Sequence, residues 1–256
     1  MKLQKISGVK FAAGTWPLAP DKATALFIHG SGGTHRLWKA QLDALVPRVN
    51  TLAIDLPGHG ASDGGGFNRV IDYAEAVLAF VDAVDAPRPV PCGLSLGGAI
   101  VQQLLIDRPN RFPAGILAGT GARLKVLPAI FEAIESDYDG FLDMLSQYAF
   151  SPVTKAAAKK TILKDTAKSD PFLTYGDYVA CNGFDVMEQL QEIQAPVLVV
   201  TAEDDKMTLP KYGDFLEKRI PNASRAHILE AGHHMPAEQP DKFNQAVVGF
   251  LDAQGF

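Results

Sequence analysis

Residues 88–109 read RPVPCGLSLGGAIVQQLLIDRP, and this stretch decides the fold. A short apolar run ends in the motif GLSLG (93–97), and residues at helical spacing follow until Pro109. The pattern predicts a strand, a sharp turn with Ser95 at its tip, and a helix. Glycine on either side of the serine removes the Cβ atoms that such a turn would crowd.

The serine at this turn has two interpretations: a reactive residue, or a residue of the turn without a chemical role. Its hydroxyl would stand beyond the strand end, beside the backbone N–H groups of a helix N-terminus, where negative charge is favoured. In the second interpretation, the segment is only a glycine-rich turn. The motif alone does not exclude this, because a Gly-x-Ser-x-Gly string occurs by chance in roughly one chain of this size in ten. The rest of the chain has to decide between the two.

Length and composition limit the class of protein. The 256 residues are 47% hydrophobic and 21% charged, which is ordinary for a soluble protein with a sizeable core. The net charge of −5 provides no basic face, so we expect neither nucleic acid nor a membrane as a partner. A small molecule is the expected partner, and the oligomeric state stays open.

No segment has the pattern of a membrane span or a signal peptide. The longest apolar runs fall well short of the ~18–20 residues of a span, and the first twenty residues lack a continuous apolar stretch. Two cysteines, Cys92 and Cys181, are too few for a disulfide framework or a zinc site. We therefore expect a cytoplasmic protein without a metal or another cofactor.

Strand-like and helix-like segments alternate over most of the chain. Continuous apolar runs predict buried strands at residues 25–28, 51–54, 114–118 and 196–200, with a weakly alternating strand at 2–10 and a last strand at 226–229. Helical patterns occupy residues 37–46, 71–84 and 209–218 and the C-terminal segment. This alternation predicts an α/β protein with a mostly parallel central sheet, helices on both faces, and functional loops at the carboxyl ends of the strands.

The alternation stops between residues 124 and 192. No convincing strand occurs there, and four short amphipathic segments look helical, at residues 127–134, 140–150, 154–163 and 172–181. The segment is too long for a simple connection. We expect a core of residues 1–123 and 193–256, with an inserted helical cap of residues 124–192 over the strand ends. The alternative is a set of ordinary surface helices beside the sheet.

The loops at the predicted strand ends contain the groups that could activate Ser95. A serine hydroxyl needs a neutral imidazole to take its proton, and the imidazole needs a carboxylate to fix its tautomer. The sequence supplies these groups in the order Ser95, Asp204 or Asp205, and His233. The backbone N–H that follows the serine and one from loop 29–33 would form an oxyanion hole.

Five motifs in this order resemble the α/β-hydrolase family, and the resemblance covers nearly the whole chain outside the expected cap. They are HGSGG (29–33), DLPGHGAS (55–62), GLSLGG (93–98), AEDDKMTLP (202–210) and AGHHMPAEQP (231–240). The resemblance implies the α/β-hydrolase fold and the activity of a serine hydrolase. It also gives the candidate residues individual roles.

The resemblance makes Ser95 the nucleophile. It makes His233, which directly follows the glycine of its motif, the base in preference to His234. It favours Asp205 over Asp204 as the acid, because the family's acid precedes a basic or apolar pair and a turn like the one that follows here.

The same resemblance implies the groups around the substrate. The second oxyanion N–H would come from Ser31, beside the one from Leu96. Four further residues are candidates for substrate binding: Gly30, Gly32, Arg123 and His234.

A serine nucleophile implies acyl chemistry, because the dehalogenases and epoxide hydrolases of this family use a carboxylate instead. We expect cleavage of a carboxylic ester, thioester or lactone through an acyl-serine. The stretch GILAGTGAR (115–123) also resembles the 3-oxoadipate enol-lactonase branch, in which case Arg123 would bind a substrate carboxylate. A carbon–carbon bond hydrolase or lyase, a perhydrolase and a non-catalytic receptor on the same fold are the alternatives.

Other polar residues have structural interpretations. We expect His29 to orient its loop through backbone hydrogen bonds, and Asp55 and His59 to hold the turn at Pro57-Gly58. Cys92, in the strand before Ser95, is expected to be a small buried apolar residue.

Overall fold

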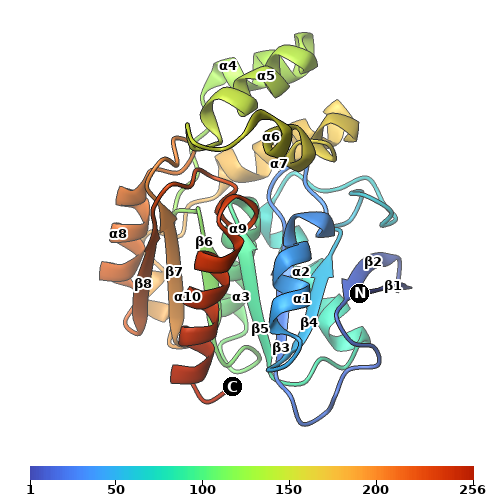
Figure 1. Cartoon of the computed structure of the whole chain (residues 1–256), viewed down its shortest axis with the longest axis vertical. Coiled ribbons are helices and arrows are strands. Elements are labelled where there is room, and N and C mark those ends of the chain that lie inside the picture. The colour runs from blue at the N-terminus through green and yellow to red at the C-terminus, as the bar shows by residue number, and fades with distance from the viewer.

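An eight-stranded sheet runs through the middle of the molecule in the computed structural model, which describes all residues from Met1 to Phe256 (Figure 1). The strand order is β1-β2-β4-β3-β5-β6-β7-β8. The strands are β1 (Lys2–Ile6), β2 (Val9–Ala13), β3 (Thr24–Ile28), β4 (Asn50–Ile54), β5 (Pro89–Leu94), β6 (Gly115–Ala118), β7 (Val197–Ala202) and β8 (Ala223–Ile228). The pairs β1–β2 and β2–β4 are antiparallel, and all other pairs are parallel. The expected mostly parallel sheet is confirmed.

Helices cover both faces of this sheet (Figure 1). One face carries α1 (Lys39–Leu45) and α10 (Pro240–Ala253), and the other carries α2 (Val70–Ala83), α3 (Leu96–Asp107) and α8 (Pro210–Arg219). Shorter elements are the 3-10 helices η1 (His35–Trp38), η2 (Thr166–Lys168) and η3 (Leu190–Glu192), and helix α9 (Met235–Glu238). None of the helices is both long enough and apolar enough to cross a membrane.

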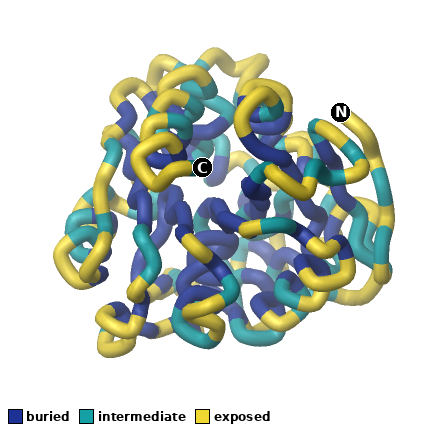
Figure 2. The backbone as a smooth tube through the Cα atoms, turned by 90° about the horizontal axis from the view of Figure 1, so that it is seen from below, coloured by how far each residue is buried: buried dark blue, intermediate teal, exposed yellow.

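The central strands are buried on both faces, as continuous apolar runs predict. Every residue of β3, β4, β5 and β7 is buried. Figure 2 shows this buried interior, with the exposed residues mainly at the periphery of the molecule. Full burial of a large apolar side chain contributes roughly 1.5–3 kcal/mol, so these strands form a rigid platform for the loops at their carboxyl ends.

The N-terminal segment forms a hairpin, where the sequence predicted one weak strand over residues 2–10. Ser7 and Gly8 have positive φ angles of 48° and 81°, which reverse the chain in a two-residue turn and pair Ile6 with Val9. The prediction was wrong because an alternating pattern at a sheet edge does not show where one strand ends and the next begins.

Strand β8 begins at Ala223, three residues before the start that its apolar run predicts. It is one of the two edge strands of the sheet, and its first five residues are partly or fully exposed. The apolar run therefore marked only the C-terminal part of the strand, where Ile228 is its one buried residue.

Four helices lie between β6 and β7 along the chain and beyond the carboxyl ends of the strands in space (Figure 1). They are α4 (Pro128–Ser136), α5 (Tyr138–Tyr148), α6 (Ala156–Ile162) and α7 (Pro171–Gly183), and each overlaps a predicted helix. Their boundaries have local causes. Proline occupies the first turn of α4 and α7, and the carboxylates of Asp137 and Asp170 accept from the first free N–H groups of α5 and α7.

Candidate active site

Ser95 lies at the tip of the turn between β5 and α3, in a strained backbone conformation. Its φ is 56° and its ψ is −115°, a combination that residues with a side chain rarely adopt. A Cβ at position 93 would overlap the carbonyl group of Gly97, and one at position 97 would overlap the carbonyl oxygen of Ile28. Only glycine fits at both positions, so the turn itself requires the motif.

Two hydrogen bonds hold the tip in place. The Ser95 N–H donates to the carbonyl of Ala118 at the end of β6 (3.0 Å), and the hydroxyl of Thr120 donates to the carbonyl of Ser95 (2.9 Å). A conformation of this kind costs on the order of 1–3 kcal/mol. The surrounding sheet therefore fixes a geometry that the isolated turn would avoid.

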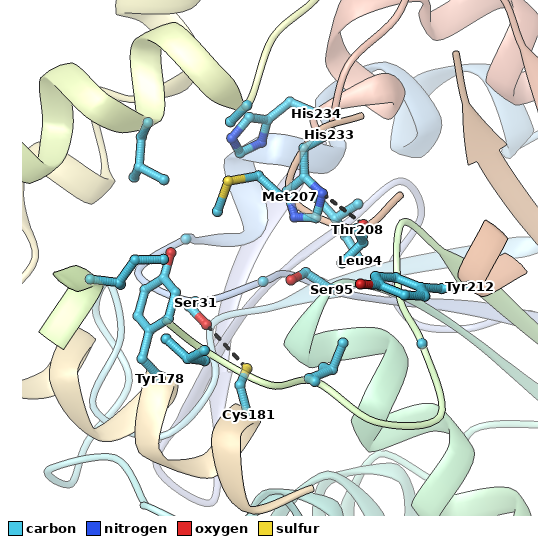
Figure 3. Close-up of a pocket in the computed structure, with 18 of the residues that line it drawn as sticks. Ser31, Leu94, Ser95, Tyr178, Cys181, Met207, Thr208, Tyr212, His233 and His234 are labelled. Carbon is cyan, nitrogen blue, oxygen red and sulfur yellow. Dashed lines mark hydrogen bonds between the residues drawn. The ribbon is translucent and has the colours of Figure 1, made fainter. Parts of the chain in front are cut away.

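The Ser95 side chain faces a cavity of about 500 Å³ between the strand ends and the inserted helices (Figure 3). Residues from the strand-end loops line one part of it: Gly30, Ser31, Ser95, Thr208 and His233. Residues of the inserted helices line the other part: Ile130, Leu145, Ile162, Tyr178 and Cys181. A largely apolar wall with a few convergent polar groups is typical of a site for a small molecule.

His233 reaches this cavity with one edge of its ring and contacts a carboxylate with the other. Its Nδ1 lies 2.9 Å from Oδ2 of Asp205, which is 2% exposed. The Thr208 hydroxyl donates to the same carboxylate (2.7 Å), and the N–H groups of Met207 and Thr208 donate to its other oxygen (2.9 and 2.8 Å). An ionised carboxylate only accepts hydrogen bonds, so Nδ1 of His233 carries the proton and Nε2 has none in the neutral imidazole.

Burial and charge shift the pKa values of His233 and Asp205 in opposite directions. Burial lowers the pKa of His233, but the charge and hydrogen bond of Asp205 outweigh burial and leave that pKa above its ordinary value. Burial raises the pKa of Asp205, but the charge of His233 and the bonds from His233 and Thr208 leave it below its ordinary value. The carboxylate is therefore ionised at neutral pH and stabilises a positive charge on the imidazole.

The neighbouring carboxylate of Asp204 points elsewhere. Its Oδ2 accepts a hydrogen bond from the hydroxyl of Ser151 (2.6 Å), in the loop after α5. Of the two acids that the sequence left open, only Asp205 contacts His233.

The loop after β3 places Ser31 opposite His233 across the cavity (Figure 3). The N–H of Gly33 donates to the carbonyl of Gly30 (3.1 Å), so the loop closes on itself around Ser31. Leu96 is the first residue of α3, and the N–H groups of a first helical turn have no partner within the helix. Two backbone N–H groups near Ser95 are thus available to a ligand oxygen.

A model of the alpha/beta hydrolase family matches residues 25–246, most of the chain. The chain belongs to the alpha/beta hydrolase family. The match confirms the family and the fold that the five motifs predicted.

Known relatives of this hydrolase include esterases and lactonases. A 3-oxoadipate enol-lactonase of Acinetobacter baylyi is 28% identical over 89% of this chain and 88% of its own. A solved structure of a thermophilic esterase has a TM-score of 0.81 and 33% identity, covering 99% of this chain and 98% of that one. Est816, an N-acyl homoserine lactone degrading enzyme, gives a TM-score of 0.79 and 28% identity, covering 97% and 100%. These similarities support ester hydrolysis by an enzyme of this family.

Two further residues that the sequence predicted to bind substrate, Arg123 and His234, lie at the cavity. Arg123 lines the cavity, and its guanidinium Nε is 3.5 Å from Oδ2 of Asp185, with both side chains about half exposed. His234 also lines the cavity and stacks on the ring of Phe150, with centroids 4.9 Å apart. Burial and the charge of His233 lower the pKa of His234 to about 3, so this second imidazole is neutral at physiological pH.

The polar residues with structural interpretations lie behind the cavity. His29 is fully buried, with Nδ1 2.8 Å from the carbonyl of Gly30 and Nε2 accepting from the N–H of Leu56 (3.0 Å). It orients its loop as expected. Asp55 accepts from the Ala61 N–H in the turn that it was expected to hold (3.2 Å).

Sequence analysis did not identify one buried carboxylate near this site. Asp177 of α7 is 0% exposed and contacts the loops after β3 and β4. It lies on the same helical face as Leu173 and Cys181, which are also buried. A charged residue on an otherwise apolar helix face was the available signal.

Proposed function

We propose that this hydrolase cleaves a carboxylic ester, thioester or lactone through an acyl-serine intermediate on Ser95. The observation that carries the proposal is the 2.9 Å contact between His233 and the buried Asp205, on the cavity that Ser95 faces. The strained turn and the free N–H groups beside it support the same chemistry.

The first half of the reaction forms the acyl-serine. The Ser95 oxygen attacks the carbonyl carbon of the substrate while Nε2 of His233 takes the hydroxyl proton. The carbonyl oxygen becomes an oxyanion, which accepts hydrogen bonds from the N–H groups of Ser31 and Leu96. Collapse of this intermediate breaks the bond to the leaving alcohol or thiol, which receives the proton from His233.

The second half repeats these steps with water. His233 takes a proton from the water, whose oxygen attacks the acyl carbon, and the same oxyanion hole stabilises the second intermediate. Collapse returns the proton to Ser95 and releases the acid. A lactone gives a single hydroxy acid, because its leaving group stays attached to its acyl group.

We propose that residues 124–192 act as the cap that shapes the substrate site. Apolar side chains of α4, α5 and α6 close the cavity opposite the strand ends, so they would contact the acyl chain or the leaving group. Gly30 and His234 line the same cavity and would contact the substrate near the reacting carbon.

Partitioning of a common intermediate tests the acyl-serine. Esters with the same acyl group and different alcohols, assayed in the presence of methanol, are expected to give one ratio of methyl ester to free acid. The reason is that both products arise from the same acyl-enzyme. A ratio that changes with the alcohol would contradict the intermediate. A series of p-nitrophenyl esters of graded length measures how much chain the cavity accepts.

Arg123→Ala tests whether Arg123 binds a substrate carboxylate. KM is expected to rise about fivefold for an ester that carries a carboxylate, since a half-exposed ion pair contributes about 1 kcal/mol, and to stay constant for the neutral analogue. Asp185→Asn is the matched control, because it frees the guanidinium from its present partner and should lower KM for the acidic ester only. Equal KM values for acidic and neutral esters in all three proteins would remove this role.

A further inference from the structure

Asp177 is a buried carboxylate that joins three separate parts of the fold. Its Oδ2 accepts from the Gly32 N–H in the loop after β3 (2.9 Å) and contacts Nε2 of His59 in the loop after β4 (2.8 Å). Its Oδ1 accepts from the hydroxyl of Tyr73 on α2 (2.6 Å). The residue itself belongs to α7, one of the inserted helices.

The partner of this carboxylate is a charged imidazole. Nδ1 of His59 faces the carbonyl of Pro57 (3.1 Å), and its Nε2 faces Asp177. Both neighbours only accept hydrogen bonds, so both ring nitrogens carry protons. The charge of Asp177 outweighs burial and raises the pKa of His59, in agreement with this geometry. The pair is therefore ionic, and Asp177 is a strong acceptor for the Gly32 N–H.

The loop that contains Ser31 is fixed on both sides of this residue. Nε2 of His29 accepts from the Leu56 N–H, so its Nδ1 carries the proton and donates to the carbonyl of Gly30 (2.8 Å). On the other side, Asp177 holds the N–H of Gly32. The Ser31 N–H has no acceptor within the chain and remains available at the cavity.

We infer that Asp177 positions the oxyanion hole, because it holds the Gly32 amide and thereby aims the Ser31 N–H at the cavity. The inference rests on the proposed function of that N–H. Asp177 is a positioning residue that does not touch the substrate. A second carboxylate of the inserted segment, Asp165, binds the same loop through the hydroxyl of Thr34 (2.6 Å) and the guanidinium of Arg36 (2.8 Å).

The consequence is that the oxyanion hole and the substrate cavity are assembled together. Helix α7 supplies both Asp177 and cavity residues such as Tyr178 and Cys181. Seating of α7 on the strand-end loops therefore builds the cavity wall and fixes the Ser31 loop in one step. A change that unseats this helix lowers the rate of the chemical step as well as substrate affinity.

Three variants separate positioning from simple stabilisation. Asp177→Leu replaces the acceptor with a larger apolar side chain, and Asp177→Asn keeps the shape of the side chain with a weaker, neutral acceptor for the Gly32 N–H. Tyr73→Phe is the matched control, since it removes one hydrogen bond from the same carboxylate and leaves Oδ2 with Gly32 and His59. The readouts are kcat, KM, thermal stability, and the Ki of a trifluoromethyl ketone that forms a tetrahedral oxyanion on Ser95.

The inference predicts a graded loss. We expect kcat to fall roughly 100-fold in Asp177→Leu and about 3- to 10-fold in Asp177→Asn, the scale of a weakened oxyanion-hole donor. We expect little change in KM, and we expect Ki for the ketone to rise by about the same factor as kcat falls. Tyr73→Phe should lower thermal stability but leave kcat and Ki at wild-type values. If Asp177→Leu does not fold, the difference in kcat and Ki between Asp177→Asn and Tyr73→Phe tests the inference.

Two results would overturn the inference. One is wild-type kcat and Ki in folded Asp177→Asn, and the other is an equal loss of kcat in Tyr73→Phe. Ser95→Ala, measured in the same assay, distinguishes a failure of the proposed function from a failure of the positioning role. If Ser95→Ala retains activity, the proposed function fails. If it is inactive while the Asp177 variants match wild type, only the positioning role fails.

Discussion

Ser95→Ala is expected to lower kcat/KM for an ester substrate by at least about 10⁴-fold, the scale found when a triad nucleophile is removed. The reason is that Ser95 combines three features, a combination that no other hydroxyl on this cavity shares. It lies at a strained turn, it faces the cavity, and the N-terminus of α3 begins directly after it. The alanine side chain occupies the space of the serine, so the fold and its thermal stability should be retained. The measurement is kcat/KM with a p-nitrophenyl ester, together with a thermal melt.

Ser31→Ala is the matched control for this variant. It makes the same chemical change in the same cavity, but the proposed role of residue 31 uses its backbone N–H, which alanine keeps. Its kcat/KM should therefore stay within about threefold of wild type, since the oxyanion donor is unaltered. Comparable losses in both variants would show that the serine hydroxyl at position 95 has no special role.

Asp205→Asn is expected to lower kcat by roughly 10³- to 10⁴-fold, because an amide no longer fixes the tautomer of His233 or stabilises its positive charge. Asp204→Asn is the neighbouring control. Its side chain contacts Ser151 instead of the imidazole, so kcat should change little. A large loss in Asp204→Asn with a small one in Asp205→Asn would reverse the assignment of the acid.

The pH profiles of the wild type and of Asp205→Asn give an independent readout. The reaction needs neutral His233, so kcat/KM of the wild type should rise with pH, with a midpoint above the ordinary imidazole pKa of about 6.5, because Asp205 raises this pKa. In Asp205→Asn only the smaller effect of the Glu238 charge opposes burial, so the midpoint of the residual activity should move to lower pH. An unchanged midpoint in Asp205→Asn would contradict the contact between the two side chains.

The fold was predictable where one local pattern determines the structure. The strand–serine–helix turn is specified by steric exclusion at Gly93 and Gly97, which a sequence displays directly. Strands such as β3 and β7 are buried on both faces, so composition alone identifies them. The hairpin at Ser7-Gly8 was missed because its edge strand, β1, buries too little apolar surface to leave such a pattern.

The candidate site was predictable only in part, because side-chain direction is a property of the folded loop. Asp204 and Asp205 are adjacent and chemically identical, yet they point to different partners, and spacing alone cannot separate them. Asp177 is 145 residues from Gly32 along the chain, and their contact exists only once the inserted helices are seated. The roles of Ser95, Asp205 and His233 in catalysis stay predictions.

Labelling with a fluorophosphonate probe tests the activated serine most directly. The Ser95 oxygen is expected to bond to phosphorus and expel fluoride, which adds the mass of one probe group to the wild-type protein. The same treatment should leave Ser95→Ala unmodified, and digestion should place the adduct on the peptide that contains GLSLGG. An equal adduct on folded Ser95→Ala, or no adduct on folded wild type, would contradict the account.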